Sequence, residues 1–274
     1  MDHQTIASKN NPPVVLITGG GSGIGAATAR VLVQQGWTVV ICGRRAHILE
    51  QTARETGAHA LVVDLTEPSS VIELINSIIN RFGKLNGLVL NAGIVRAGKV
   101  GDLNNLDWAT MVETNLTAPY RLLHVSLPHL ISSKGSIVGI ASVSALRASK
   151  GIAGYNATKA GLSMLIRSIA VDYGTQGVRA NVICPGWTRS EMADQEMNAF
   201  ANERNMNMEQ AYQLATALVP LQRPALGKEI AALTAWLLSS SASYMNGAEI
   251  PIDGGLTSVD PGTIVFDSNI SLTA

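Results

Sequence analysis

The sequence has few cysteines, no excess of either charge and no long apolar run. Its two cysteines, Cys42 and Cys184, end apolar stretches, so we expect buried free thiols in a reducing compartment rather than a disulfide. Lysine plus arginine equals aspartate plus glutamate at 20 each, which leaves no basic surplus for nucleic acid. No run reaches the roughly 18 apolar residues that span a membrane, and residues 1–13 lack the apolar segment of a secretory signal. We therefore predict a cytoplasmic protein that binds neither nucleic acid nor membrane.

Two further absences narrow the chemistry. His124 and His129 are five positions apart, off the usual spacing of paired ligands on a helix, and no cysteine or acidic cluster accompanies them. We therefore expect core or surface histidines and no metal site. No G-x-S-x-G elbow surrounds Ser142, and this disfavours a serine hydrolase.

The sequence is rich in hydrophobic residues, and these recur in a regular pattern of runs. Hydrophobic residues make up 46% of the 274 positions and charged residues 15%, so a sizeable folded core is expected. Uninterrupted apolar runs alternate with helical patterns, which is typical of parallel strands covered on both faces. We predict a single-domain α/β fold, a Rossmann-like doubly wound parallel sheet of about seven strands, with its ligand at the carboxyl ends of the strands.

The expected elements follow from these runs and their stop signals. Strands are predicted at 14–17, 37–42, 60–63, 87–90, 136–140, 178–183 and 249–252. The main helices are predicted at 26–35, 106–131 with interruptions at Pro119 and Pro128, 154–173 and 227–238. A leader (1–13) and a tail (256–274) flank the domain at 14–255. A strandless helical lid is expected at 187–218, because a structureless loop of this length would be unusual.

A glycine-rich turn follows the first predicted strand. Residues 18–25 read TGGGSGIG, and an alanine-rich helical pattern comes next. Glycine allows the backbone to approach a ligand closely, and the amides and dipole of a helix N-terminus favour an anion. The spacing is not a clean GxGxxG, so the strand before and the helix after carry the argument. We expect a phosphate cradle; the alternative is a tight turn without a ligand.

Several polar residues lie directly after strands or open a helix. Tyr155 and Lys159 share one helical face because they are four positions apart. A free phenol has a pKa of about 10, which a nearby positive charge lowers. Such a tyrosine can exchange a proton with a substrate oxygen that a serine hydroxyl also holds. Singly, each residue also fits an ordinary structural role.

Together these motifs resemble those of the short-chain dehydrogenase/reductase family. The resemblance covers residues 14–255, and Ser142 precedes Tyr155 by the 13 positions that the family shows. The matching segments are TGGGSGIG at 18–25, Asp64, NAG at 91–93, Asn115, Ser142, YNATK at 155–159, PG at 185–186 and PIDGG at 251–255. Two positions depart from the family pattern, Asn86 where Asp is frequent and Leu90 where Asn is frequent. Both are structural positions in the family.

The resemblance implies roles for particular residues. Tyr155 would be the acid/base, Lys159 would lower its pKa and bind the nicotinamide ribose, Ser142 would orient the carbonyl, and Asn115 would hold a relay water. The implied cofactor-binding residues are Gly19, Ser22, Gly23, Ile24, Gly25, Arg44, Asp64, Leu65, Asn91, Ala92, Gly93, Tyr155, Lys159, Pro185, Gly186 and Thr188. The implied substrate-binding residues are Ser142, Ser144, Tyr155 and Trp187.

The predicted function is an NADP(H)-dependent oxidoreductase that interconverts a small-molecule carbonyl and a secondary alcohol. NADP is expected over NAD because Gly43 stands where an acid would hold the ribose 2′-hydroxyl, and Arg44 follows it. The alternatives are a 3-oxoacyl carrier-protein reductase and a non-catalytic dinucleotide sensor. A homotetramer is expected, partly by resemblance and partly because the helices at 106–131 and 154–173 are apolar over more than one stripe. The lid methionines, Met192, Met197, Met206 and Met208, either line a substrate pocket or pack against the body.

Overall fold

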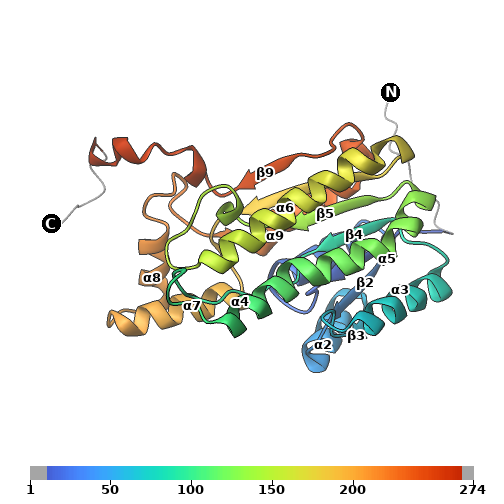
Figure 1. Ribbon diagram of the computed structural model, residues 1–274, viewed down its shortest axis with the longest axis horizontal. Coiled ribbons are helices and arrows are strands. Elements are labelled where there is room, and N and C mark those ends of the chain that lie inside the picture. Colours follow the sequence, from blue (N-terminus) through green and yellow to red (C-terminus); the bar gives the residue numbers. More distant parts are fainter. Residues whose placement is uncertain (1–10, 267–274) are drawn as a thin grey trace.

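A seven-stranded parallel sheet forms the centre of the computed structural model, which describes residues 11–266 (Figure 1). The strand order is β3-β2-β1-β4-β5-β6-β9, so the winding reverses between β1 and β4. The strands are β1 (Val14–Thr18), β2 (Thr38–Gly43), β3 (His59–Val62), β4 (Gly87–Leu90), β5 (Ser136–Ile140), β6 (Arg179–Pro185) and β9 (Glu249–Ile252). This confirms the predicted doubly wound fold, and the reversal is where such sheets bind ligands.

Helices cover both faces of the sheet. On one face α3, α5 and α6 pack against apolar side chains such as Leu88 and Ile137, and on the other α1, α2 and α9 pack against Ile17 and Val89. Alternate residues of β4 therefore point into different cores, which explains why its sequence is apolar throughout. The helices are α1 (Gly23–Gln34), α2 (Ala46–Thr56), α3 (Pro68–Phe82), α4 (Asn105–Val112), α5 (Ala118–Ser133), α6 (Ala153–Tyr173), α7 (Glu191–Glu203), α8 (Met208–Ala215) and α9 (Gly227–Leu238).

The predicted helix at 106–131 is longer and less interrupted than expected. The helix α4 passes through a π-helical turn, Glu113–Thr117, directly into α5. Pro119 follows the π-helical turn and Pro128 lies inside α5, and neither proline ends the helix. A wider turn of this kind is frequent at functional sites. The third strand is also one residue earlier than predicted, at His59–Val62.

The segment predicted as a strandless lid contains a short strand. The strand β7 (Thr188–Arg189) pairs with β8 (Ala225–Leu226), so that part of the prediction was wrong. Two residues are too few to give a recognisable apolar pattern. The helices α7 and α8 follow and share a small core of their own that includes Met197, with Met206 and Met208 packed against it. Met192 is exposed.

The ends of the chain are described only in part. Of the predicted leader and tail, residues 1–10 and 267–274 lie outside the described residues. Cys42 and Cys184 are free and buried, as expected, and burial is the main cause that raises the pKa of each thiol to about 12. Within residues 11–266, no helix combines the length and apolarity needed to cross a membrane.

Candidate active site

Hydrogen bonds from the loop after β4 fix the glycine turn after β1. The Thr18 hydroxyl accepts hydrogen bonds from the backbone N–H groups of Asn91 and Ala92, at 2.9 and 3.0 Å. The Asn91 side chain in turn donates to the carbonyls of Thr18 and Gly19, at 2.9 and 3.1 Å. The two loops at the reversal of the sheet therefore form one rigid unit, which unites the predicted residues Gly19, Asn91 and Ala92.

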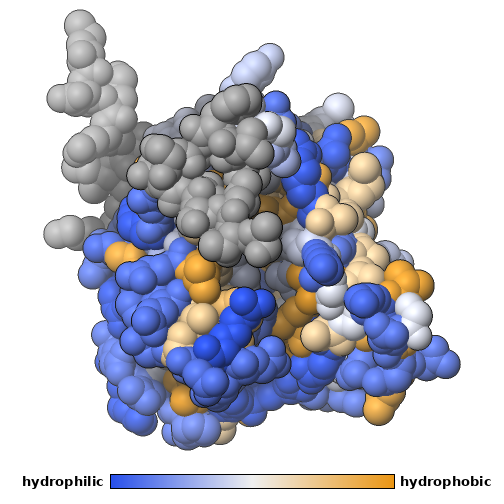
Figure 2. Space-filling view, turned by 90° about the vertical axis from the view of Figure 1, so that its left-hand side faces the viewer, coloured by the Kyte–Doolittle hydropathy of each residue, from blue (hydrophilic) through white to orange (hydrophobic). Residues whose placement is uncertain are grey.

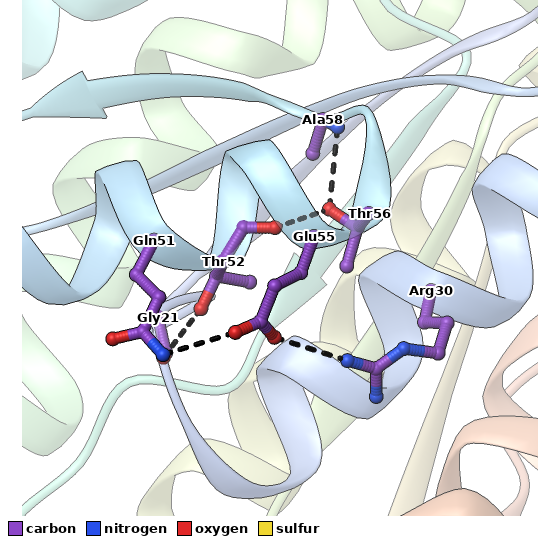
Figure 3. Close-up of polar contacts among 7 residues, drawn as sticks. All are labelled: Gly21, Arg30, Gln51, Thr52, Glu55, Thr56 and Ala58. Atoms are coloured by element: carbon purple, nitrogen blue, oxygen red, sulfur yellow. Dashed lines mark hydrogen bonds and ion pairs between the residues drawn. The ribbon is translucent and has the colours of Figure 1, made fainter.

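The turn is too tightly packed for side chains at its key glycines. A Cβ at Gly25 would lie 2.3 Å from the Gly19 carbonyl oxygen and 2.7 Å from Asn91 Nδ2. Gly19 and Gly23 have φ values of 63° and 52°, in the left-handed region that favours glycine. Figure 3 shows a second support, the Thr52 hydroxyl of α2, which donates to the Gly21 carbonyl at 2.8 Å.

The glycine turn leads directly into α1, whose first-turn amides have no side-chain cap. Ser22 is the N-cap of α1, but its side chain makes no capping hydrogen bond. The N–H groups of the first turn, at Gly23, Ile24 and Gly25, thus have no side-chain cap. Uncapped amides at a helix N-terminus beside a close-packed glycine turn suit the pyrophosphate of a dinucleotide.

The predicted reacting groups meet at the carboxyl edge of β5. Ser142 follows β5, and its Oγ accepts from the Ser144 backbone N–H at 3.1 Å. The Ser142 side chain also lies close enough to the phenol of half-buried Tyr155, in the first turn of α6, to oppose the rise of its pKa. Lys159, one turn further along α6, has its Nζ 5.6 Å from the centre of the Tyr155 ring. The structure thus brings these four predicted residues together.

Burial rather than the neighbouring lysine governs the protonation of Tyr155. Desolvation raises the pKa of the phenol to about 12; the nearby Ser142 side chain opposes this, and the charge of Glu196 adds to it. The net shift is therefore upward, and a lowering of this pKa by Lys159 stays a prediction. Burial also lowers the pKa of Lys159 itself to about 8, so this side chain is still mostly charged at neutral pH and loses its charge above about pH 8. The Lys159 Nζ donates to the Ile140 carbonyl at 2.9 Å.

Asn115 lies in the π-helical turn and is fully buried. Its side chain accepts from the Ile94 N–H and donates to the Ile94 carbonyl, both at 2.8 Å, and donates to the Thr158 hydroxyl at 3.1 Å. It therefore ties the loop after β4 to α6. A Cβ at Gly93 would lie 3.2 Å from Lys159 Nζ and 3.3 Å from Asn115 Oδ1, so these side chains converge on that loop.

The remaining predicted residues border the same edge of the sheet. Asp64 accepts from the N–H and hydroxyl of Thr66, at 3.0 and 2.8 Å, and Leu65 lies between them. The N–H of Thr66 is the main cause that lowers the pKa of Asp64, and the charge of Arg44 contributes. On the other side β6 ends at Pro185, and the buried Thr188 hydroxyl donates to the Gly186 carbonyl at 3.1 Å. Trp187 packs against the small core of α7 and α8.

Sequence reasoning missed two acidic residues of α7. Glu196 lies close enough to raise the pKa of Tyr155, and burial raises its own pKa. Glu191 forms a two-point ion pair with Arg45, 146 positions away. Neither residue belongs to a motif, and only the folding of α7 over this edge places them there. Among residues 11–266 no group of three or more potential metal ligands occurs.

The fold and the grouped residues define a Rossmann-fold oxidoreductase. A family model described as enoyl-(acyl carrier protein) reductase matches residues 19–257. The chain belongs to the short-chain dehydrogenase/reductase family, whose members here include dehydrogenases that act on alcohols.

Three similar proteins illustrate the family. Protein MoaE of Klebsiella aerogenes is 37% identical over 92% of this chain and 98% of its own. Meso-2,3-butanediol dehydrogenase of Serratia marcescens is 34% identical over 90% of this chain and 95% of its own. A crystal structure of a variant actinorhodin polyketide ketoreductase with NADPH superposes with a TM-score of 0.87, at 29% identity, over 93% of this chain and all of that one.

The buried lysine generates a prediction about stability and pH. Because its folded-state pKa is about 8 against a usual 10.5, the charged form is disfavoured in the folded protein. The resulting loss of folding stability is present in full below pH 8 and fades as pH rises toward 10.5. Lys159→Met removes this loss at every pH. From about pH 7.5 to about pH 10, the unfolding free energy of wild type should therefore rise by about 2 kcal/mol relative to that of the variant.

Urea denaturation of both proteins at the two pH values measures this shift. Other groups that titrate in the range cancel in the difference between the two proteins. A difference that stays constant with pH would show that Lys159 is not titrating with a lowered pKa.

Proposed function

We propose that the protein is an NADP(H)-dependent oxidoreductase that interconverts a carbonyl compound and a secondary alcohol, with Tyr155 as its acid/base. The observation that carries this is the meeting of Ser142, Tyr155 and Lys159 at the sheet edge beside an uncapped glycine cradle. The cradle suits a dinucleotide, and the hydroxyl pair suits a substrate oxygen.

Each side chain then has a chemical task. The Tyr155 phenol donates its proton to the carbonyl oxygen in reduction and accepts it back in oxidation. Ser142 holds the same oxygen. The bound nicotinamide cofactor supplies or receives the hydride. Asn115 ties the loop after β4 to α6, and Lys159 ties α6 to the end of β5, so both hold the elements that surround this oxygen.

The phenol needs help to ionise during alcohol oxidation. With its pKa raised to about 12, the phenol keeps its proton at neutral pH. A protonated Lys159 close to the ring favours the phenolate, and so does any further positive charge brought to the site. Reduction, in which Tyr155 starts protonated, needs no such shift.

NADP preference rests on the end of β2. Gly43 provides no carboxylate for a ribose 2′-hydroxyl, and the exposed Arg44 beside it presents a planar fork that suits a phosphate. Asp64, whose pKa the charge of Arg44 helps to lower, lies nearby and fits the adenine end. The similar ketoreductase crystallised with NADPH also supports this choice.

Exposed apolar side chains support the proposed homotetramer. Leu106, Trp108 and Tyr120 of α4 and α5, and Met164 and Val171 of α6, are 45% to 80% exposed. Large apolar side chains gathered on adjacent helices favour association with another copy. We further propose the cytoplasm as the location, supported by the free thiols of Cys42 and Cys184.

The substrate is a small molecule that enters beneath α7 and α8, the proposed lid. Figure 2 shows the end of the molecule that carries these helices; it is largely hydrophilic, with hydrophobic surface in and beside a hollow near the centre of the view. An acyl carrier-protein substrate is the main enzymatic alternative. A panel of ketones, diketones and 3-oxoacyl thioesters with NADPH separates the two. The intact Ser142, Tyr155 and Lys159 argue against a non-catalytic sensor.

Tyr155→Phe tests the acid/base assignment. The substitution removes only the phenolic oxygen and its proton, so turnover should fall by more than about a hundredfold while NADPH binding changes little. Steady-state kinetics and a fluorescence titration with NADPH measure the two quantities. Retention of more than a few per cent of the activity would refute the role of Tyr155.

Arg44→Ala tests the cofactor preference. A charged contact with the 2′-phosphate contributes about 1.5–3 kcal/mol, so the ratio of kcat/KM for NADPH over NADH should fall on the order of ten- to a hundredfold. The same ratio in the wild type should favour NADPH. A wild type that prefers NADH, or an unchanged ratio in the variant, contradicts the assignment of Arg44.

Light scattering at micromolar concentration tests the oligomer. We expect the mass of a tetramer for the wild type and a smaller species for Leu106→Glu/Val171→Glu, because charges on the exposed apolar face oppose association. A monomeric mass for the wild type would refute the proposal.

A further inference from the structure

An ion pair joins the start of α7 to the end of β2, beside the glycine cradle. The guanidinium of Arg45 donates to both carboxylate oxygens of Glu191, with N–O distances of 2.5 and 2.7 Å. One of its nitrogens also lies 3.2 Å from the Ser22 hydroxyl, as donor. Ser190, just before Glu191, also lies against the cradle. A Cβ placed on Gly23 would be 3.1 Å from the Cβ of Ser190. The pair therefore bridges the two sides of the predicted phosphate site.

The two neighbouring arginines, Arg44 and Arg45, have different surroundings. Arg44 lies close enough to Asp64 for its charge to help lower the pKa of that carboxyl. Arg45 instead has its fork occupied by a carboxylate, which presents two oxygens as a phosphate does. The hydrogen bonds from Arg45 are the main cause that lowers the pKa of Glu191, so this carboxylate is charged at neutral pH.

We infer that Glu191 is a specificity-determining residue for the cofactor: by neutralising Arg45 it limits the preference for a 2′-phosphate over a 2′-hydroxyl. The chain lacks an acid at the end of β2, and the lid helix supplies one to the same region from a distant part of the sequence. This inference rests on the proposed dinucleotide function, since it concerns the same site.

The exposure of the pair determines the size of the effect. The side chains of Arg45 and Glu191 are 50% and 43% exposed, and pairs so exposed are weak. A doubly charged phosphate can therefore take Arg45 from Glu191 at a modest cost. We expect removal of the Glu191 charge to strengthen binding of a 2′-phosphate about fivefold, which corresponds to about 1 kcal/mol.

The test uses two nucleotides that differ only in the 2′-phosphate. Titration calorimetry of the full chain gives the Kd of 2′,5′-ADP and of 5′-AMP, and the ratio of the two isolates the phosphate. In Glu191→Gln, which keeps the shape of the side chain, the preference for 2′,5′-ADP should rise about fivefold. In Arg45→Leu/Glu191→Gln the rise should disappear, because the released arginine is gone.

A matched control is available between α1 and α2. Arg30 and Glu55 form another exposed pair, at 3.4 Å and with both side chains 50% exposed (Figure 3). Glu55→Gln also removes one negative charge from this region of the protein. Glu55, however, does not contact Ser22 or Arg45. It should leave the nucleotide ratio unchanged.

Three outcomes would overturn the inference. These are a ratio unchanged or lowered in Glu191→Gln, an equal rise in Glu55→Gln, and a rise that persists in the double variant. Arg44→Ala on the same nucleotides tests the proposed NADP preference separately. If it lowers the ratio while Glu191→Gln has no effect, the inference fails and the proposed function stands. If wild type does not favour 2′,5′-ADP and Arg44→Ala changes nothing, the proposed preference fails.

Discussion

The hydrogen bonds between Thr18 and the Asn91–Ala92 backbone are the constraint on which the site depends. They join the loop after β1 to the loop after β4 at the point where the sheet changes winding direction. The Asn91 side chain returns two bonds to the glycine turn. Because the position of Gly25 leaves no room for a side chain against this turn, α1 begins in a single place relative to β4. The cradle and the reacting groups are thus held in one frame.

The same frame explains why buried polar residues are tolerated here. Asn115, with no exposed surface, satisfies its amide through Ile94 and Thr158. Lys159 is only 4% exposed and donates to a single carbonyl, so its charge is weakly compensated and its pKa falls. A fully compensated lysine would be a more stable arrangement but a less responsive neighbour for a phenol. The site therefore gives up stability at the place where proton transfer is proposed.

Much of the fold could be predicted from the sequence because its signals are local. The apolar run of β1, the glycines after it and the spacing of Tyr155 and Lys159 all lie within short windows. The short strand β7 could not be predicted, since two residues carry no periodicity. The π-helical turn at Asn115 could not be predicted from the sequence either, because its extra residue continues the helical pattern. The contacts of Glu191 and Glu196 depend on where α7 lies, and no local rule specifies that.

The small core shared by α7 and α8 has a mechanical consequence. Tyr212 is fully buried in it, its hydroxyl donates to Asp194 at 2.7 Å, and the guanidinium of Arg189 stacks on its ring at 3.7 Å. Segments with their own core keep their internal order when they change position, so little conformational entropy is lost each time. The two helices therefore form one compact unit, joined to the rest of the domain by the chain near Gly186 and 216–224. Loss of Tyr212 from its core would disturb both helices at once.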